Sequence, residues 1–217
     1  MNPYHVRNEK IFNVTSISPL AAKDLVQSQI REYSLAIAPI RDKSSTIPKE
    51  SSPTAWSPPP SGYTKLNFDA AYMDQDGSGG IGLILRNKTG LFLAAKAIHI
   101  SHCLNARTTE ALAAREALHR ASEIHLSHLI IESNSYGVIK LIDSNQPLPP
   151  DNEVIILDCR RFKQQLQDIC FSFTLRTGNC SAHIVAKHSR SINGKTLWTS
   201  CPPSWLINSL KGDMGFC

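Results

Sequence analysis

The 217-residue sequence lacks several features that would assign it to other classes of protein. It contains no run approaching the roughly 20 apolar residues that a membrane-spanning helix needs. Its first residues, MNPYHVRNEK, have no apolar core of the kind found in signal peptides. Its six cysteines include no CxxC pair. We therefore expect an intracellular protein, nuclear or cytoplasmic, whose thiols are reduced and which does not enter a membrane.

A strong charge bias and clear metal-ligand clusters are also missing. The net charge of +5 permits an anionic partner such as nucleic acid but does not require one. Two His-x-x-His spacings occur, His99/His102 and His125/His128, but no cysteine or acidic residue accompanies them at matching spacing. We interpret both pairs as surface histidines, with half of a zinc site as the alternative.

The distribution of serine and proline divides the chain into four parts. Residues 41–62 are dense in Ser and Pro and poor in large apolar residues, which predicts a linker without a core. Before it, residues 1–40 form an N-terminal extension, in which apolar side chains at roughly helical spacing predict one helix over residues 19–36. After it, we expect one domain over residues 63–190 and a C-terminal tail over residues 191–217.

Three strand-like segments open the predicted domain. The stretch TKLNFDAAY, residues 64–72, alternates apolar and polar side chains with a period of two. Two further apolar runs, residues 80–87 and 91–100, flank the Asn-Lys-Thr-Gly sequence at residues 87–90, which favours a tight turn. Three consecutive strands with short connections predict an antiparallel meander.

Helical periodicity then alternates with short apolar runs. Alanine and leucine recur every three or four residues over residues 106–124, which predicts a helix. A buried strand follows at residues 128–133, then a helix up to residue 143, a helix capped by Asp151, a strand over residues 169–176 and a last helix over residues 179–191. The order predicts an α/β fold with a five-stranded mixed sheet, in which parallel strands lie beside the meander.

Polar residues at three places in this pattern suggest a site. Asp69 stands in the middle of the first strand, where a charge is costly unless it faces a site or a partner. Glu110 lies near the start of the long helix, and Asn134 follows the fourth strand. Their convergence at one end of the sheet would suit a divalent metal ion. The alternative is an edge strand with a solvated Asp69.

The stretches KLNFDAA, GGIGLILRNKTG, TTEALAAREAL, IIESNS and GNCSAHIVAKHS resemble the type 1 ribonuclease H family, and more closely its plant-type, reverse-transcriptase-like branch. The resemblance covers about residues 63–190. The flanking stretches RNEKIFN and LWTSCPPSWLINSLKGD look like segments found beside this domain in remnants of non-LTR retroelements. The resemblance implies the RNase H-like fold, with helices flanking the sheet.

The resemblance also implies a catalytic site. In that family, four residues surround two magnesium ions that hydrolyse the RNA strand of an RNA/DNA hybrid. By motif, the corresponding positions are Asp69, Glu110, Asn134 and His183. The first three would be the ligands of Mg²⁺ or Mn²⁺, and His183 would take part in phosphate contact or product release.

Asn134 stands where the family has an aspartate. An asparagine keeps the shape of that ligand but loses its negative charge, and its amide nitrogen donates. Two dications about 3.5 to 4 Å apart need anionic ligands, so we expect one metal ion rather than two. Glu132 lies two residues earlier on the same face, but its backbone is about 6 to 7 Å further from the strand end, so we do not expect it to compensate.

The resemblance implies a nucleic-acid partner, either an RNA/DNA hybrid or double-stranded RNA, recognised by shape across the minor groove. The candidate contact residues are polar or basic and lie near the expected site: Asn67, Gln75, Asn105, Arg107 and Arg176. We expect a monomer. Three functions remain open: a metal-dependent nuclease, a non-catalytic nucleic-acid-binding or interaction module, and a degenerate reading frame without a selected function.

Overall fold

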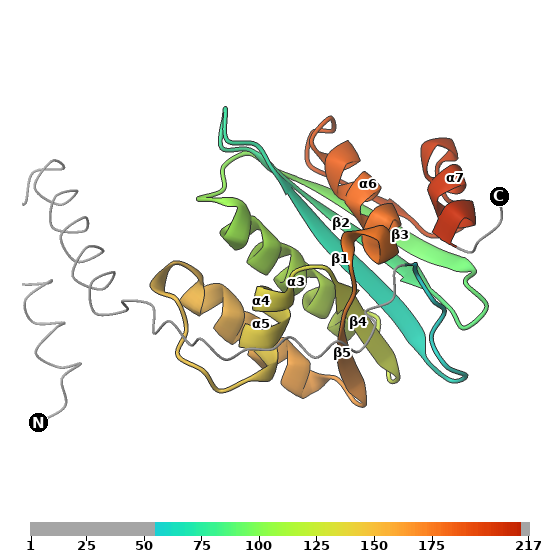
Figure 1. Ribbon diagram of the computed structural model, residues 1–217, viewed down its shortest axis with the longest axis horizontal. Helices are drawn as coiled ribbons and strands as arrows, with labels where there is room; N and C mark the ends of the chain where they lie inside the picture. Colours follow the sequence, from blue (N-terminus) through green and yellow to red (C-terminus); the bar gives the residue numbers. More distant parts are fainter. Residues whose placement is uncertain (1–54, 214–217) are drawn as a thin grey trace, which may run out of the picture. The chain divides into compact units, whose positions relative to one another are not determined.

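The computed structural model describes residues 55–213 (Figure 1). The helix expected over residues 19–36 lies outside the described residues, as does most of the predicted linker. Within the described part, no helix is both long enough and apolar enough to cross a membrane. The five cysteines of residues 55–213 are free thiols.

A six-stranded mixed sheet forms the centre of the domain. Its strands are β1 (Thr64–Tyr72), β2 (Gly79–Arg86), β3 (Phe92–Ile100), β4 (Leu129–Ser133), β5 (Ile169–Phe173) and β6 (Lys195–Trp198), in the spatial order β5-β4-β1-β2-β3-β6. Strands β1, β2 and β3 form the predicted antiparallel meander, and β4 and β5 run parallel to β1. The predicted mixed α/β sheet is therefore confirmed.

The sixth strand was not predicted. β6 pairs antiparallel with β3, through partners such as Ala95 and Trp198, and it lies in the segment that we expected to be a tail. Its four residues, KTLW, alternate between exposed and half-buried positions. So short a segment has no periodicity of its own to recognise. The sheet therefore extends past Arg190, where we placed the end of the domain.

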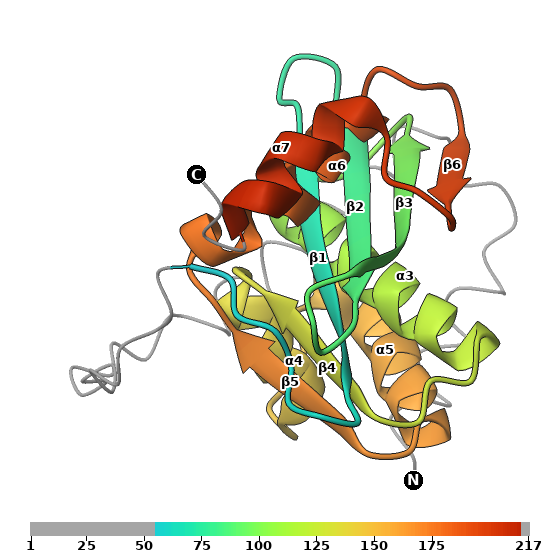
Figure 2. The ribbon, with the colours of Figure 1, turned by 90° about the vertical axis from the view of Figure 1, so that its right-hand side faces the viewer.

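Helices cover both faces of the sheet (Figure 2). α3 (Ala106–Glu123), α4 (Tyr136–Asp143) and α5 (Glu153–Gln165) lie on one side, and α6 (Cys180–Ser189) and α7 (Ser204–Asp213) lie on the other. Short 3-10 turns, η1 (Pro150–Asn152) and η2 (Arg176–Asn179), precede α5 and α6. The residue at the N-cap of α5 is Asn152 rather than the predicted Asp151, because the 3-10 turn delays the helix.

Alternation along β1 separates an apolar face from a polar one. Leu66 and Phe68 belong to the larger core, together with the alanine-rich face of α3. Asn67 and Asp69, which alternate with them, point to the face that carries α6, and both are buried, with 0% and 2% of their surface exposed. β1 is an interior strand, between β4 and β2. The alternative of an edge strand with a solvated Asp69 is therefore wrong.

Two glycines of β2 let α6 rest directly on the sheet. A Cβ atom at Gly82 would lie 2.3 Å from the carbonyl oxygen of Ala182, and one at Gly80 would lie 2.4 Å from that of Ala186. No real contact is that short, so a side chain at either position would push the helix away. Gly82 is the register partner of Asp69 on the neighbouring strand. The sequence GGIG thus fixes the distance between α6 and the strand that carries Asp69.

Candidate active site

The candidate site lies where β1 and β4 separate. Their parallel pairing ends at the partners Asn67 and Glu132, so the backbone of β1 beyond that point is free on this side. The side-chain nitrogen of Asn179, at the end of η2, donates 2.9 Å to the free carbonyl oxygen of Phe68. The end of η2 therefore fills the gap and brings the start of α6 to Asp69.

His183 and Arg176 line one side of Asp69. Nδ1 of His183 lies 2.7 Å from Oδ2 of Asp69, and Nη2 of Arg176 lies 2.8 Å from Nε2 of His183. A guanidinium only donates hydrogen bonds, so Nε2 must accept. The consistent assignment is a neutral imidazole that donates from Nδ1 to Asp69. His183 therefore holds the orientation of Asp69, and Arg176 holds that of His183.

Glu110 is the second carboxylate of the site. Its Oε2 atom is buried and has no hydrogen-bond partner within residues 55–213. Burial, together with the negative charge of Asp69, raises the pKa of Glu110 from 4.5 to about 8, while Arg176 opposes the shift. Glu110 is thus close enough to Asp69 to be affected by its charge. Without a cation beside it, the raised pKa of Glu110 favours its protonated form at neutral pH.

Asn134, the third expected ligand, is half-buried after the end of β4. Its Oδ1 atom accepts a hydrogen bond of 2.9 Å from Nδ2 of Asn179. That bond uses one of the two lone pairs of the oxygen and holds the oxygen toward Asn179. The structure therefore brings together Asp69, Glu110, Asn134 and His183, but it commits the carbonyl of Asn134 to another side chain.

A buried polar network extends from Asn179 to side chains of strands β1 and β4. Asn67 donates from Nδ2 to Oδ1 of Asn179 at 3.2 Å and to Oε1 of Glu132 at 2.9 Å. The other carboxylate oxygen of Glu132 pairs with Lys65 at 2.9 Å. Both oxygens of Glu132 are therefore occupied, which supports the expectation that this residue does not replace the missing aspartate.

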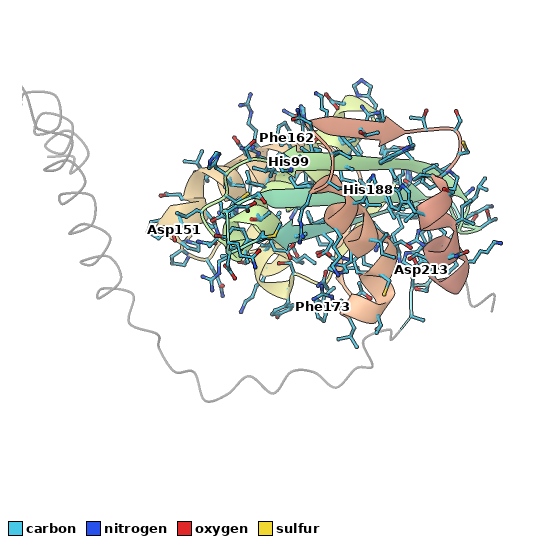
Figure 3. The ribbon with its side chains drawn as sticks, turned by 90° about the horizontal axis from the view of Figure 1, so that it is seen from above. His99, Asp151, Phe162, Phe173, His188 and Asp213 are labelled. Carbon is cyan, nitrogen blue, oxygen red and sulfur yellow. The ribbon has the colours of Figure 1, made fainter. Side chains whose placement is uncertain are left out.

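Trp56 and Asp213, at the two ends of the described residues 55–213, complete the polar network. The indole of Trp56, a residue placed in the predicted linker, is 4% exposed and donates 2.9 Å to Oδ1 of Asn67. The guanidinium of Arg86 stacks on the Trp56 ring at 3.5 Å and pairs with Asp213 at 2.7 Å. Figure 3 labels Asp213 at the end of α7. The segment around Trp56 thus belongs to the packed domain.

A divalent metal ion, which the family resemblance implies, fits part of this arrangement. The unpartnered oxygen of Glu110 and its repulsion with Asp69 are what a bound cation would relieve. Within residues 55–213, however, no group of three or more His, Cys, Asp or Glu side chains is gathered around one point. The chain thus offers two carboxylates, enough to hold one ion and too few anionic groups for two.

The expected nucleic-acid contact residues differ in accessibility. Gln75, Arg107 and Arg176 are exposed, and Arg107 lines a cavity beside the start of α4. Asn105 is the N-cap of α3, because its side-chain oxygen accepts from the backbone nitrogen of Thr108 at 2.9 Å. Asn67 is fully buried and its amide is saturated, so it cannot contact a ligand in this structure.

The roles of two residues, Asn179 and Trp56, in the site and its polar network were not predicted from the sequence. Asn179 connects the site to the network, but one asparagine beside a glycine also fits a turn. Trp56 lies among prolines and serines, a composition that predicts disorder. A large aromatic residue inside such a segment was the one available signal that it packs against the domain.

Comparisons with known proteins agree with this fold. The family model described as reverse transcriptase-like matches residues 67–189. RNase H1 from the halophilic archaeon Halobacterium salinarum is 21% identical, with a TM-score of 0.54 over 60% of this chain and 98% of that one. The N-terminal RNase H domain of a Mycobacterium tuberculosis protein is 15% identical, with a TM-score of 0.55 over 59% of this chain and 94% of the other.

A third solved structure, LC11-RNase H1 in complex with an RNA/DNA hybrid, is 15% identical, with a TM-score of 0.54 over 59% of this chain and 96% of that one. A comparison with curated proteins finds no match. At these identities the structural neighbours show a shared fold only. The family model, in contrast, covers more than half of the chain. This protein therefore belongs to the reverse transcriptase-like family of RNase H-type domains.

Proposed function

We propose that this domain binds RNA/DNA hybrids and hydrolyses their RNA strand slowly, with one Mg²⁺ or Mn²⁺ ion held by Asp69 and Glu110. The observation that carries this proposal is the unpartnered, buried Oε2 of Glu110 beside Asp69. A buried acceptor without a donor is costly unless a ligand or an ion completes it. The RNase H-type fold supports hybrid hydrolysis as the reaction.

The chain's own side chains would prepare the site as follows. His183 holds Asp69 in one orientation through its 2.7 Å hydrogen bond. Glu110 must lose its proton before it can act as a ligand, and a nearby cation favours that loss. The bound ion would supply Lewis acidity at the phosphate. Arg176 is exposed next to His183 and adds positive charge where a phosphate would arrive.

Recognition of the hybrid would depend on the backbone rather than on base sequence. We propose that Gln75, Arg107 and Arg176 contact phosphates or 2′-hydroxyl groups, since they are exposed. Asn105 would act through its cap of α3, which fixes the position of Arg107. LC11-RNase H1, with a similar fold, has been solved in complex with an RNA/DNA hybrid. Double-stranded RNA is the alternative ligand of the same shape class.

The test is the cleavage of an end-labelled RNA/DNA hybrid in Mg²⁺ and in Mn²⁺. The unchanged chain is expected to cleave slowly, and Asp69→Asn is expected to abolish cleavage. Asn134→Asp is expected to raise the rate at least roughly tenfold, because it adds an anionic ligand. Cleavage that persists in Asp69→Asn would point to a contaminating nuclease and would remove the support for this proposal.

A non-catalytic binding module is the second candidate. The observation that favours it is the hydrogen bond from Asn179 to Oδ1 of Asn134, which leaves only two carboxylates for metal binding. This function predicts salt-sensitive binding of the hybrid without turnover. The same assay separates the candidates, because a binding module gains cleavage only in the Asn134→Asp variant.

We further propose a plant-type, retroelement-derived origin and a monomeric state for this domain. The origin rests on the stretches RNEKIFN and LWTSCPPSWLINSLKGD, which flank the family match. Light scattering after size-exclusion chromatography tests the monomer: a mass near 24.0 kDa is expected. A mass of twice that value would contradict it.

A further inference from the structure

The amide groups near the candidate site form a chain whose direction is set by donors that cannot accept. The chain begins at Asn67, whose Oδ1 lies 2.9 Å from the indole nitrogen of Trp56 and 3.2 Å from Nη2 of Arg86. Indole and guanidinium groups have no acceptor atom. The oxygen of Asn67, and not its nitrogen, must therefore face them.

That orientation determines the next link. With its oxygen toward Trp56, Asn67 turns its nitrogen toward Glu132 and toward Oδ1 of Asn179. A carboxylate accepts hydrogen bonds, so the contact with Glu132 agrees with this orientation. Asn179 must then present its oxygen to Asn67 and its nitrogen to the opposite side.

The last link reaches the site. Nδ2 of Asn179 donates to the carbonyl oxygen of Phe68 and to Oδ1 of Asn134, both at 2.9 Å. The backbone oxygen of Phe68 can only accept, so it confirms the orientation of Asn179 independently of Asn67. Asn134 therefore directs its single carbonyl oxygen at Asn179. Its NH2 group, on the other branch of the amide, is therefore not the group that meets Asn179.

We propose that Asn134 serves the site as a hydrogen-bond donor for a phosphate oxygen of bound nucleic acid, and not as a metal ligand. Asn179 and Asn67 are positioning residues that impose this polarity. This inference rests on the proposed function, because it assigns a role to one residue of that site. It changes the expected ligand set to Asp69 and Glu110 alone.

A reversal of Asn134 would disturb the whole chain of amides. If its oxygen faced the site, its nitrogen would face Nδ2 of Asn179, and two donors would meet. Reversing Asn179 as well would lose the bond to Phe68 and would bring its nitrogen against that of Asn67. Reversing Asn67 in turn would leave the buried donors of Trp56 and Arg86 without an acceptor.

An aspartate at position 134 would behave differently because it has two oxygens. One oxygen would accept from Asn179, as Asn134 does now, and the other would face the carboxylate pair. Asn134→Asp therefore converts a donor into an anionic acceptor at one place, with almost no change in shape. Comparing Asn134→Asp with Asn134→Ala, which removes the amide, therefore separates a role as hydrogen-bond donor from a role as metal ligand.

The first arm of the test measures Mn²⁺ binding by calorimetry with the full chain. We expect Asn134→Ala to bind Mn²⁺ as the unchanged chain does, within a factor of two, and Asn134→Asp to bind at least tenfold more tightly. Weaker binding by Asn134→Ala would show that the residue is a ligand and would overturn the inference. If Asn134→Asp does not bind Mn²⁺ more tightly than the unchanged chain, the inference is overturned as well.

The second arm measures the affinity for a labelled RNA/DNA hybrid in EDTA, where no metal contributes. We expect Asn134→Ala to bind about fivefold more weakly, and Asn134→Asp to bind more weakly still, because its charge repels phosphate. Asn145→Ala, at an exposed asparagine outside the site, is the matched control and should not change the affinity. Equal affinity of Asn134→Ala and the unchanged chain would overturn the donor role.

The third arm tests the positioning role of Asn179. In a double-mutant cycle on hybrid affinity, Asn179→Ala should lose as much as Asn134→Ala, and the double variant should lose no more than either. Additive losses would show that the two residues act independently. In side-chain amide NMR spectra, the N–H protons of Asn179 should exchange slowly with water and those of Asn134 rapidly.

The proposed function can fail separately from this inference. Binding of the hybrid without cleavage would reject the nuclease and leave the donor role to the second arm. If the unchanged chain does not bind the hybrid, both the proposed function and the donor role fail. The Mn²⁺ and NMR arms would then still decide whether the oxygen of Asn134 faces Asn179.

Discussion

Nδ1 of His183 lies 2.7 Å from Oδ2 of Asp69 and connects helix α6 to strand β1 across the candidate site. The two residues are 114 positions apart in the sequence. They meet because α6 rests on the backbone of β2 at Gly80 and Gly82. The position of the carboxylate therefore depends on a packing contact that contains no chemical group of the site.

Removal of the imidazole should release Asp69. We expect His183→Ala to lower Mn²⁺ affinity or hybrid cleavage by about 10- to 100-fold, the usual effect of losing a partner that orients a ligand. His183→Gln, which can still donate to Asp69, should recover part of the loss. The measurement is Mn²⁺ titration of the three chains. Equal affinities would show that Asp69 is oriented without His183.

The raised pKa of Glu110 makes stability depend on pH. A carboxyl group whose pKa rises from 4.5 in the unfolded chain to about 8 in the folded one binds more protons when folded. Its contribution to stability is therefore full below pH 4.5 and is lost as pH rises toward 8, at no more than about 1.4 kcal/mol per pH unit.

Glu110→Gln should remove that dependence. In EDTA, we expect the variant and the unchanged chain to differ little in unfolding free energy near pH 5, and the variant to be the more stable near pH 8. Urea unfolding at a series of pH values provides the measurement. Parallel curves for the two chains would mean that Glu110 is ionised in the folded protein without a metal ion.

Metal binding should release a proton. The ion needs Glu110 as a carboxylate, so Mn²⁺ affinity should increase up to roughly tenfold per pH unit below about pH 8. Calorimetry at pH 6.5 and 7.5, in two buffers with different ionisation enthalpies, counts the released protons. Asp69→Asn is the control and should bind little Mn²⁺ at either pH. A release of no protons would contradict the predicted state of Glu110.

The ion pair between Arg86 and Asp213 should be essential for stability. Both side chains are buried, and Ser181 adds a hydrogen bond of 2.6 Å to Asp213. Asp213→Ala leaves a buried guanidinium unpaired and should cost about 3 to 5 kcal/mol of unfolding free energy. Asp151→Ala, at an exposed position, should cost almost nothing. Urea unfolding distinguishes the two, and equal midpoints would contradict the prediction.

Gly82 should not tolerate a methyl group. Gly82→Ala places a Cβ atom 2.3 Å from the backbone of α6, which overpacks the contact and should destabilise the domain by about 1 to 3 kcal/mol or more. Gly137→Ala is the matched control, because open space surrounds that helical position and alanine favours helix by up to about 1 kcal/mol. A thermal melt should move down for the first variant and up or not at all for the second.

Much of the fold follows from local patterns in the sequence. The alternation of TKLNFDAAY and the periodicity of residues 106–124 predicted β1 and α3 within a residue of their observed bounds. The positions of Asp69 and Glu110 at one end of the sheet followed from the order of the elements. The predictions of β1 and α3 succeeded because strand and helix periods are properties of short segments.

The rest depends on contacts that no local pattern records. β6 exists because β3 offers an edge, and four residues alone would not form a strand. The burial of Asn67 depends on Trp56, Arg86 and Glu132, which come into contact with it only when the chain folds. The polarity of Asn134 depends in turn on Asn179. These side-chain hydrogen bonds join residues that are between 11 and 65 positions apart in the sequence.

The pairing of Arg86 with Asp213 also constrains how the chain can be made. During synthesis, Arg86 leaves the ribosome 127 residues before its partner. Until then the sheet can form, but the guanidinium has no carboxylate to accompany it into the interior. A stop codon between residues 184 and 213 would therefore yield a chain that holds every group of the candidate site and still lacks the carboxylate of Asp213 that pairs with Arg86.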